Sequence, residues 1–327
     1  MRSARLELAF PDGVADRALV IGADGSEELP GFDRARTEIV EQHAHHFNAL
    51  TARGWQVGFQ ARGEFRTILV SIPRSRDAAR ARIAEAAAHL APDGALWIDG
   101  QKTDGIEAIL KETKQFGGVS DVMSKAHGKI ARINDPAAIP LDWAAAALTP
   151  APGFTTRAGM FSADRIDPGS AALAAALPDR LPTRIVELGS GWGWLAAQIL
   201  THPGVETLHL VEADHAAHLC AQQNINDPRV HFHWADARSF RLPDPVNGVI
   251  MNPPFHEGRA ADPKLGIAFI KAAASLLTGA GRLWMVANRH LPYEAALDQY
   301  FGEFSEIAGD NKFKILSATR ARRGQSS

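Results

Sequence analysis

The sequence has one cysteine, little net charge and no long apolar run. Its single cysteine, Cys220, excludes an internal disulfide and is typical of a reducing compartment. No apolar run approaches the roughly 18 residues of a membrane-spanning helix, and the first residues lack the apolar segment of a signal peptide. A net charge of −2 excludes a uniformly basic protein, so a nucleic-acid partner would require a local basic patch. These absences predict a cytoplasmic protein that does not enter a membrane.

The sequence does contain enough apolar material for two globular domains. Hydrophobic residues make up 46% of the 327 residues, and domains commonly hold about 150 residues each. Residues 134–158 are rich in proline and alanine, which predicts a linker with a short helix from Trp143 to Leu148. The predicted domains are therefore residues 1–133 and residues 159–327.

Strand and helix patterns alternate through the second half of the chain. The predicted strands are Arg184–Leu188, Thr207–Glu212, Val230–Trp234, Gly248–Asn252, Arg282–Ala287 and Phe313–Ala318. The predicted helices are Trp194–Leu200, His215–Asn224, Gly266–Leu277 and Tyr293–Tyr300. Such alternation indicates an α/β fold in which helices cover both faces of a mostly parallel sheet.

The first half repeats part of this pattern more weakly. A predicted strand, Thr67–Ile72, and a predicted helix, Asp77–Leu90, precede residues 92–98, which parallel residues 278–286. Ile72 stands where the second half has Asn252, and no glycine-rich turn follows an early strand. We therefore expect two Rossmann-like domains in tandem, of which the N-terminal one is degenerate.

A glycine-rich turn follows the first predicted strand of the second half. Its glycines, Gly189, Gly191 and Gly193, permit a tight bend and a close approach of a ligand to the main chain. Glu212 ends the next strand, at a spacing that suits a carboxylate accepting hydrogen bonds from ribose hydroxyls. Trp194 replaces the third glycine of the dinucleotide fingerprint, so a nucleoside ligand without a pyrophosphate fits better.

Asn252-Pro253-Pro254-Phe255 leaves a buried apolar strand and is the most informative stretch of the chain. Each proline fixes φ near about −65° and removes a backbone donor, so the segment cannot extend the sheet. It presents an amide side chain and free carbonyl groups beside an aromatic ring. This rigid set of acceptors suits a planar amine. Asp236, after the third strand, could accept from an adenine amine, although a turn or helix N-cap residue is the simpler interpretation.

Together these motifs resemble a class I S-adenosylmethionine-dependent methyltransferase, and the Asn-Pro-Pro-Phe form resembles enzymes that methylate exocyclic amines. Residues 159–170, 252–258 and 287–293 more narrowly resemble the bacterial ribosomal RNA guanine-N2 methyltransferases of the small or large subunit. The resemblance is close across residues 153–320. It is looser across the first half, which in that family is a degenerate domain that binds no cofactor.

The resemblance implies which residues hold the cofactor, S-adenosylmethionine. They are Phe161, Asp167, Gly169, Ser170, Glu187, Gly189, Gly191, Gly193, Glu212, Asp236 and Asn252. It also implies the catalytic segment, which is Asn252, Pro253, Pro254 and Phe255, and two substrate contacts, Phe255 and His256. No metal is implied.

The function that the resemblance implies is methyl transfer to the N2 amine of a guanine in ribosomal RNA, with the 16S RNA of the small subunit as the expected substrate. Other acceptors stay open: a large-subunit guanine, an adenine N6, a protein glutamine or a small molecule. A non-enzymatic RNA-binding assembly factor is a further alternative.

Two runs of basic residues predict contacts with RNA phosphates. The first comprises Arg62, Arg66, Arg74, Arg76, Arg80 and Arg82, and the second comprises Lys312, Lys314, Arg320, Arg322 and Arg323. The expected partner is ribosomal RNA or a ribosomal subunit. The duplicated domains favour a monomer, because tandem domains can replace the pairing that other methyltransferases gain by dimerising.

Overall fold

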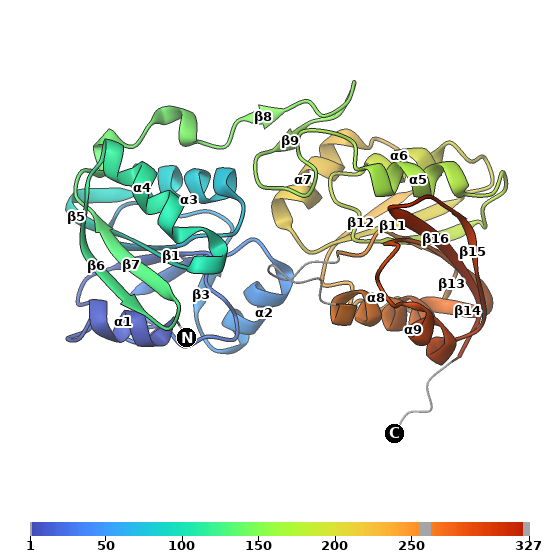
Figure 1. The fold of residues 1–327 in the computed structure, drawn as a ribbon, viewed down its shortest axis with the longest axis horizontal. Helices are drawn as coiled ribbons and strands as arrows, with labels where there is room; N and C mark the ends of the chain where they lie inside the picture. Colours follow the sequence, from blue (N-terminus) through green and yellow to red (C-terminus); the bar gives the residue numbers. More distant parts are fainter. Residues whose placement is uncertain (1, 255–262, 323–327) are drawn as a thin grey trace. The chain divides into compact units, whose positions relative to one another are not determined.

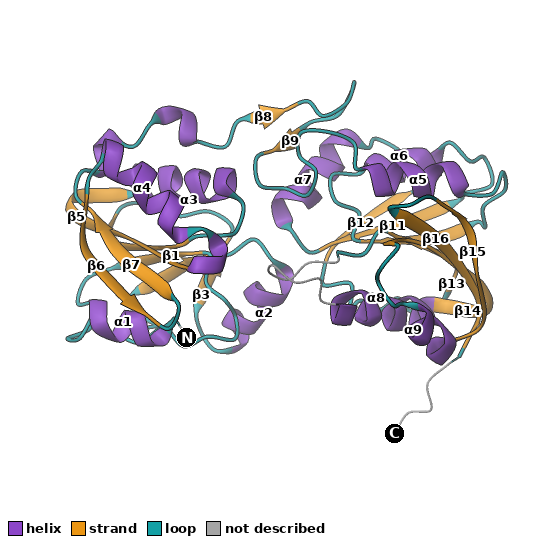
Figure 2. Ribbon diagram, in the orientation of Figure 1, coloured by secondary structure: helices purple, strands orange, loops and turns teal. Residues whose placement is uncertain are grey.

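Each half of the chain folds around one seven-stranded sheet (Figure 1). The computed structural model describes residues 2–254 and 263–322. The N-terminal unit comprises Met1–Ala147 and Arg157–Gly159, and the C-terminal unit comprises Leu148–Thr156 and Met160–Ser327. Within each unit, helices cover both faces of the sheet (Figure 2). The predicted α/β class, with two Rossmann-like domains in tandem, is therefore confirmed.

The N-terminal sheet has the strand order β3-β2-β1-β4-β5-β7-β6. Its strands are β1 (Ala18–Ile21), β2 (Thr37–Val40), β3 (Gln56–Gly58), β4 (Phe65–Ser71), β5 (Leu90–Gln101), β6 (Val119–Lys125) and β7 (Gly128–Ile133). Its helices are α1 (Ser3–Ala9), α2 (Ala44–Ala52), α3 (Arg76–Ala88) and α4 (Ile106–Phe116). Strands β1 to β5 pair in parallel, whereas β7 is antiparallel to both β5 and β6.

The C-terminal sheet has the equivalent order, β12-β11-β10-β13-β14-β16-β15. Its strands are β10 (Arg184–Leu188), β11 (Thr207–Glu212), β12 (Val230–Trp234), β13 (Val246–Met251), β14 (Leu277–Asn288), β15 (Phe301–Gly309) and β16 (Phe313–Ala321). Its helices are α5 (Pro168–Ala176), α6 (Trp194–Leu200), α7 (His215–Asn224), α8 (Pro263–Leu276) and α9 (Glu294–Tyr300). The shared order agrees with the predicted duplication.

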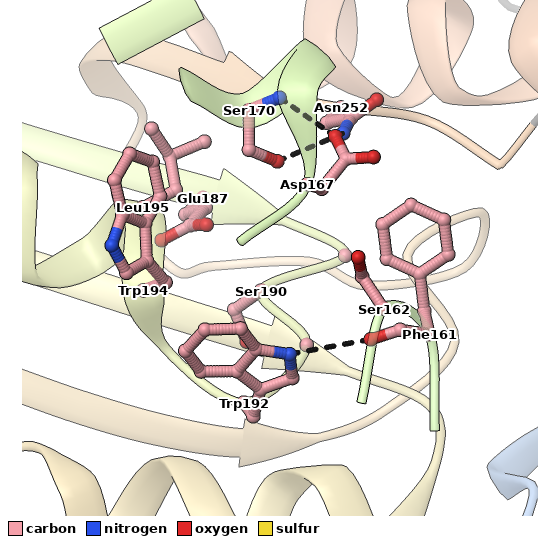
Figure 3. Close-up of a pocket in the computed structure, with 12 residues that line it drawn as sticks. Phe161, Ser162, Asp167, Ser170, Glu187, Ser190, Trp192, Trp194, Leu195 and Asn252 are labelled. Atoms are coloured by element: carbon pink, nitrogen blue, oxygen red, sulfur yellow. Dashed lines mark hydrogen bonds between the residues drawn. The ribbon is translucent and has the colours of Figure 1, made fainter. Parts of the chain in front are cut away.

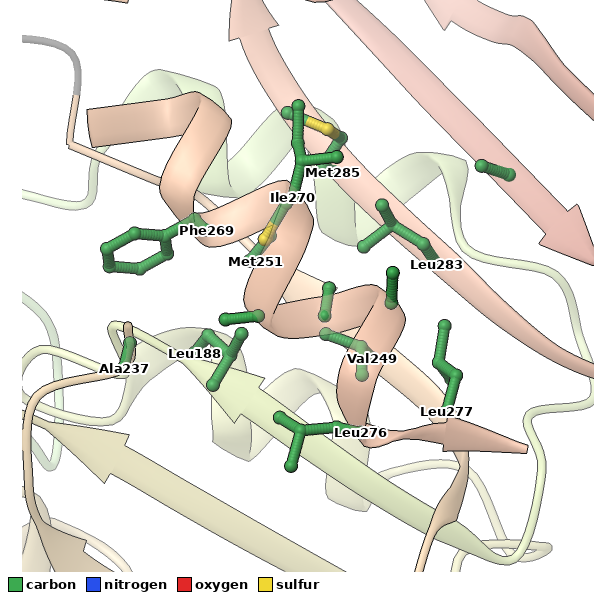
Figure 4. Packing of buried hydrophobic residues seen from close by; sticks show 14 of the residues in the cluster. Leu188, Ala237, Val249, Met251, Phe269, Ile270, Leu276, Leu277, Leu283 and Met285 are labelled. Atoms are coloured by element: carbon green, nitrogen blue, oxygen red, sulfur yellow. The ribbon is translucent and has the colours of Figure 1, made fainter. Parts of the chain in front are cut away.

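The central strands of the C-terminal sheet are buried on both faces. In β13, Val249 and Met251 belong to the core formed with α8 and α9 (Figure 4), whereas Ile250 belongs to the core formed with α5 and α6. Each fully buried aliphatic side chain stabilises the fold by roughly 1.5–3 kcal/mol. A parallel strand that is buried on both faces therefore needs a continuous run of apolar residues, as β13 has. This burial fixes the carboxyl ends of β10 and β13, where the polar residues of the site begin.

The predicted helix from Trp143 to Leu148 is wrong. A 3₁₀ turn (η3) spans Leu141–Trp143, and Ala144 is extended, with φ −60° and ψ 142°. The chain then forms β8 (Ala147–Leu148), which pairs with β9 (Thr156–Arg157). Pro150 disfavours the helical conformation in the residue before it, and strand pairing outweighs the helix propensity of the alanines.

Candidate active site

A pocket of the C-terminal unit lies at the carboxyl ends of β10 and β13 (Figure 3). The lining residues come from the glycine-rich turn, from the beginnings of α5 and α6, and from the segment before α5. They are Phe161, Ser162, Asp167, Ser170, Glu187, Gly189, Ser190, Gly191, Trp192, Trp194, Leu195 and Asn252. Ligands of open α/β sheets bind at this edge, so the pocket is the candidate active site.

The glycine-rich turn has a backbone that only glycine adopts readily. Gly189, Gly191 and Gly193 have φ values of 75°, 55° and 93°, all in the left-handed region. A Cβ atom added to Gly191 would meet nothing within 4 Å, so the main chain is open to a ligand there. A Cβ atom added to Gly193 would lie 3.1 Å from Ile225, so Gly193 instead permits close packing next to α7.

Glu212, the last residue of β11, braces this turn. Its Oε2 accepts from the Gly191 backbone N–H at 2.8 Å, and its Oε1 accepts from the Asp214 N–H at 2.8 Å. Glu212 does not line the pocket itself but touches a residue that does. The glycine-rich turn and the acid of the next strand, which the sequence predicts to serve one ligand, are thus in direct contact with each other.

Glu187 places an unpaired carboxylate oxygen at the pocket. Its side chain is 2% exposed on β10, and its Oε2 has no hydrogen-bond partner among residues 2–254 and 263–322. Burial, and secondly the charge of Glu212, raise the pKa of the Glu187 carboxyl well above its usual value. A buried acceptor of this kind fits a ligand that carries a positively charged donor.

Replacing Glu187 with glutamine is expected to stabilise the free protein at neutral and alkaline pH. Because the pKa of Glu187 is raised, the folded protein keeps a proton that the unfolded chain releases above pH 4.5. The contribution of this group to stability is complete below pH 4.5 and is lost as the pH rises toward the raised value. Glutamine does not ionise, so the melting temperature of the variant should increasingly exceed that of the wild type as the pH rises above 4.5. A difference that does not change with pH would contradict a protonated Glu187.

The Asn252 side chain is anchored to the beginning of α5. Its Nδ2 donates to Asp167 Oδ2 at 2.8 Å and to Ser170 Oγ at 2.9 Å (Figure 3). Asp167 is also the N-cap of α5 and accepts from the Ser170 N–H at 2.7 Å. Both acceptors hold the nitrogen, which leaves the amide oxygen of Asn252 for a donor at the pocket wall.

The bulky tryptophans of the turn have separate positions. Trp192 is 5% exposed and packs with Met160, Ala217 and Cys220, while its Nε1 donates to the Phe161 carbonyl at 3.2 Å. It thereby holds the segment that carries Phe161, whose ring is 58% exposed. Trp194, the first residue of α6, lines the pocket. Neither tryptophan closes the turn to a ligand, because the main chain at Gly191 stays open.

Several predicted site residues are not among those that line the pocket. They are Gly169, Gly193, Glu212, Asp236, Pro253 and Pro254. Asp236 forms an ion pair with Arg238 at 2.8 Å and also accepts from the Arg238 backbone N–H, as the simpler turn interpretation expects. Phe255 and His256 lie outside the described residues. Ser162, Ser190 and Leu195 also line the pocket, although no local sequence pattern marks them as site residues.

Several residues of the two predicted basic runs are paired with acidic groups or buried inside the unit that carries them. Arg76 and Arg80 both pair with Glu112, at 2.5 and 2.8 Å, and Arg82 donates to a main-chain carbonyl at 2.9 Å. In the second run, Lys314 is 4% exposed. Contacts with phosphates would therefore fall to the exposed members of the two runs, which include Arg62, Arg66, Arg74, Lys312, Arg320 and Arg322.

The described part of the chain holds neither a metal-binding cluster nor a helix able to cross a membrane. Across residues 2–254 and 263–322, no group of three or more histidine, cysteine, aspartate or glutamate side chains is arranged to hold a metal ion. None of the helices described there is both long enough and apolar enough to cross a membrane.

Both halves of this chain are similar in sequence to known protein families. The family described as Methyltransferase small domain matches residues 152–317, and the family described as Methyltransferase small domain N-terminal matches residues 15–128. The chain is 30% identical over 266 residues to the ribosomal RNA small subunit methyltransferase C of Shewanella pealeana. It is 29% identical to the protein of the same name from Shewanella halifaxensis, and both alignments cover 77% of either chain.

A solved structure shares the fold of the whole chain. It is a T. thermophilus 16S rRNA N2 methyltransferase in complex with AdoMet and guanosine, with a TM-score of 0.80 and 24% sequence identity. The match covers 98% of this chain and 92% of that one, so the similarity extends over both units. The chain belongs to the methyltransferase small domain family, and the family resemblance carried by its sequence motifs is confirmed.

Proposed function

We propose that this chain transfers a methyl group from S-adenosylmethionine to the N2 amine of a guanine in 16S ribosomal RNA. The observation that carries the proposal is the Asn252 amide, whose nitrogen is bound by Asp167 and Ser170 while its oxygen remains as an acceptor at the pocket. The relatives named as small-subunit ribosomal RNA methyltransferases support the choice of acceptor.

The pocket has the donor and acceptor groups that S-adenosylmethionine needs. The unpaired Oε2 of Glu187 would accept from the ammonium group, and the open main chain at Gly191 would admit the methionine and ribose. Glu212 would accept from the ribose hydroxyls, while Asp236 remains the proposed contact for the adenine. Phe161 would close the pocket from the segment before α5. When bound, S-adenosylmethionine supplies a methyl group on a positively charged sulfur.

The residues after β13 would orient the attacking amine. The guanine 2-amino lone pair is delocalised into the ring and is a weak nucleophile. The Asn252 Oδ1 and the Pro253 carbonyl would each accept one N–H of this amine, which directs the lone pair and stabilises positive charge as it develops on nitrogen. A methylated ammonium is acidic enough to lose its proton without a strong base. Phe255 is proposed to stack on the base.

The substrate guanine must be exposed for this geometry. An amine that is paired within an RNA helix cannot enter a pocket at the end of a sheet, so the target would be unpaired or turned out of its stack. The exposed basic residues of the chain would hold the neighbouring phosphates.

Methyl transfer from labelled S-adenosylmethionine tests the proposal. The acceptors would be small subunits, large subunits and their deproteinised RNAs from cells that lack this gene, followed by digestion to nucleosides. Label in N2-methylguanosine from small-subunit RNA is the expected result. Label in another nucleoside, or in large-subunit RNA, would change the acceptor. No label in RNA, with the cofactor still bound, would favour a protein or small-molecule amine, and no cofactor binding would favour an assembly factor.

The N-terminal unit, residues 1–133 with the linker 134–158, is proposed to support RNA binding without holding cofactor. A Cβ atom added to Gly22, after β1, would lie 2.0 Å from Arg82 Nη1, so the guanidinium covers this glycine. At Gly189, after β10, the nearest atom to an added Cβ is the Phe269 ring edge at 3.5 Å. The N-terminal unit also has only four residues, 72–75, between β4 and α3. The corresponding connection of the C-terminal unit, between β13 and α8, comprises residues 252–262 and contains the Asn-Pro-Pro-Phe segment.

Titration calorimetry of the whole chain with S-adenosylmethionine is therefore expected to give one site per chain. The Arg82 guanidinium, which donates to the Ser71 carbonyl at 2.9 Å, would occupy the position that a cofactor would need in the N-terminal unit. A second site that survives Glu212→Ala would contradict a degenerate N-terminal unit.

A further inference from the structure

We propose that Asp167 and Ser170 act as positioning residues that hold the Asn252 amide in one orientation, with its oxygen toward the substrate amine. This inference rests on the proposed function, in which Asn252 accepts a hydrogen bond from that amine. It gives Asp167 and Ser170 a role different from the cofactor contacts that the family resemblance implies.

An asparagine at this position requires an external constraint. Its amide has an acceptor on one side and a two-proton donor on the other, and rotation by 180° exchanges them. A target amine offers only N–H groups to a neighbouring acceptor. The rotated amide would point N–H toward N–H, so the rotated fraction of an unconstrained population would repel the substrate.

The structure supplies the constraint through two acceptors on the same nitrogen. Asp167 Oδ2 lies 2.8 Å from Asn252 Nδ2, and Ser170 Oγ lies 2.9 Å from it. An ionised carboxylate accepts hydrogen bonds but donates none, so it cannot bind the amide oxygen instead. The rotated orientation would place the oxygen of Asn252 against the oxygen of Asp167, which excludes it.

The sequence Asp167-Pro168-Gly169-Ser170 builds this pair of acceptors. Asp167 is fixed as the N-cap of α5 by the Ser170 N–H, and Pro168 occupies the first turn, where its missing N–H costs nothing. A Cβ atom at Gly169 would lie 3.0 Å from Asp167 Oδ2 and 3.3 Å from the Phe313 ring. Gly169 thus makes room for the carboxylate, which explains its presence although it does not line the pocket.

The charge of Asp167 also strengthens the acceptor. An amide whose N–H groups donate to a carboxylate is polarised, and its oxygen becomes more negative. A more negative oxygen stabilises the positive charge that develops on the target amine. A neutral acceptor in place of Asp167 would keep the orientation but lose part of this effect.

A double-mutant cycle tests the inference. Ser170→Ala removes one acceptor and keeps the N-cap, and we expect it to lower kcat about 10-fold with unchanged cofactor affinity. Asp167→Ala should lower kcat about 100-fold, and Asp167→Asn should recover part of that loss. In an Asn252→Ala background, both losses should nearly vanish, because the group through which the two residues act is gone.

Asp167→Ala also removes the N-cap of α5, and Ser75→Ala is the matched control for the loss of a helix N-cap. Ser75 is the N-cap of α3 in the N-terminal unit, where its Oγ accepts from the Ala78 N–H at 3.3 Å. This variant should lower thermal stability as Asp167→Ala does, but leave kcat unchanged. A second measurement is hydrogen exchange of the Asn252 side-chain amide, which should be slow in the wild type and faster in Ser170→Ala.

The outcomes separate this inference from the proposed function. The positioning role would be overturned if Ser170→Ala and Asp167→Ala lowered kcat by the same factors in the Asn252→Ala background as in the wild type. It would also be overturned if either substitution lowered the cofactor affinity as much as kcat. Asn252 amide exchange that is equally fast in the wild type and in Ser170→Ala would overturn it as well. If Asn252→Ala alone leaves kcat unchanged, the proposed function fails instead.

Discussion

Replacing Asn252 with alanine is expected to lower kcat about 10²- to 10³-fold and to leave the affinity for S-adenosylmethionine nearly unchanged. The amide oxygen is a preorganised acceptor whose interaction strengthens as positive charge develops on the target amine. A contact of this kind contributes more in the transition state than in the ground state, so its loss appears in kcat. The contacts of Asn252 Nδ2 with Asp167 and Ser170 place the residue at the pocket wall, and alanine removes no buried apolar group.

Single-turnover methylation and titration calorimetry together measure the two parts of this prediction. Asn226→Ala is the control, because Asn226 is an exposed asparagine that lies after α7 and outside the pocket. A large loss of cofactor affinity in Asn252→Ala would mean that Asn252 binds cofactor and does not orient the acceptor. An unchanged kcat would remove Asn252 from the chemistry.

The central strands of the C-terminal unit were predictable because both of their faces are buried. The predicted strand Gly248–Asn252 corresponds to β13, and the predicted Thr207–Glu212 coincides with β11. β15 was not predicted, because its residues after Phe301 are exposed and it has no continuous apolar run. α5 consists almost entirely of small residues, so the sequence shows no alternation of apolar and polar residues that would mark its buried face. Strands β1 and β2 have four residues each, too few for a periodic signal.

The candidate site was predictable only in part. The glycine-rich turn, Glu212 and Asn252 each carry a local pattern with a physical reason. The hydrogen bond from Asn252 to Asp167 joins residues 85 positions apart, and its partners meet only because the beginning of α5 lies near the carboxyl end of β13. The unpaired oxygen of Glu187 is likewise a product of packing, since the same residue on an exposed strand would be solvated.

Glu212→Ala is expected to weaken S-adenosylmethionine binding about 100-fold. Hydrogen bonds to a charged group contribute roughly 1.5–3 kcal/mol each, and a carboxylate that accepts from the ribose hydroxyls makes such bonds. The substitution also removes the acceptor of the Gly191 N–H, so the turn that should cradle the cofactor loses its brace. Both effects act on binding, whereas kcat at saturating cofactor should change little.

Two variants separate the ribose contact from the brace. Glu212→Gln keeps an oxygen for the Gly191 N–H but loses the charge and the second oxygen, which accepts from the Asp214 N–H. It should therefore destabilise the free protein less than Glu212→Ala does, while still binding cofactor more weakly than the wild type. Glu206→Ala, at an exposed position just before β11, is the control and should change neither property. Because the charge of Glu212 helps to raise the pKa of Glu187, both Glu212 variants should also lower that pKa toward its usual value. Unchanged cofactor affinity in Glu212→Ala, with the fold intact, would mean that the ribose is held by other residues and that Glu212 serves the turn alone.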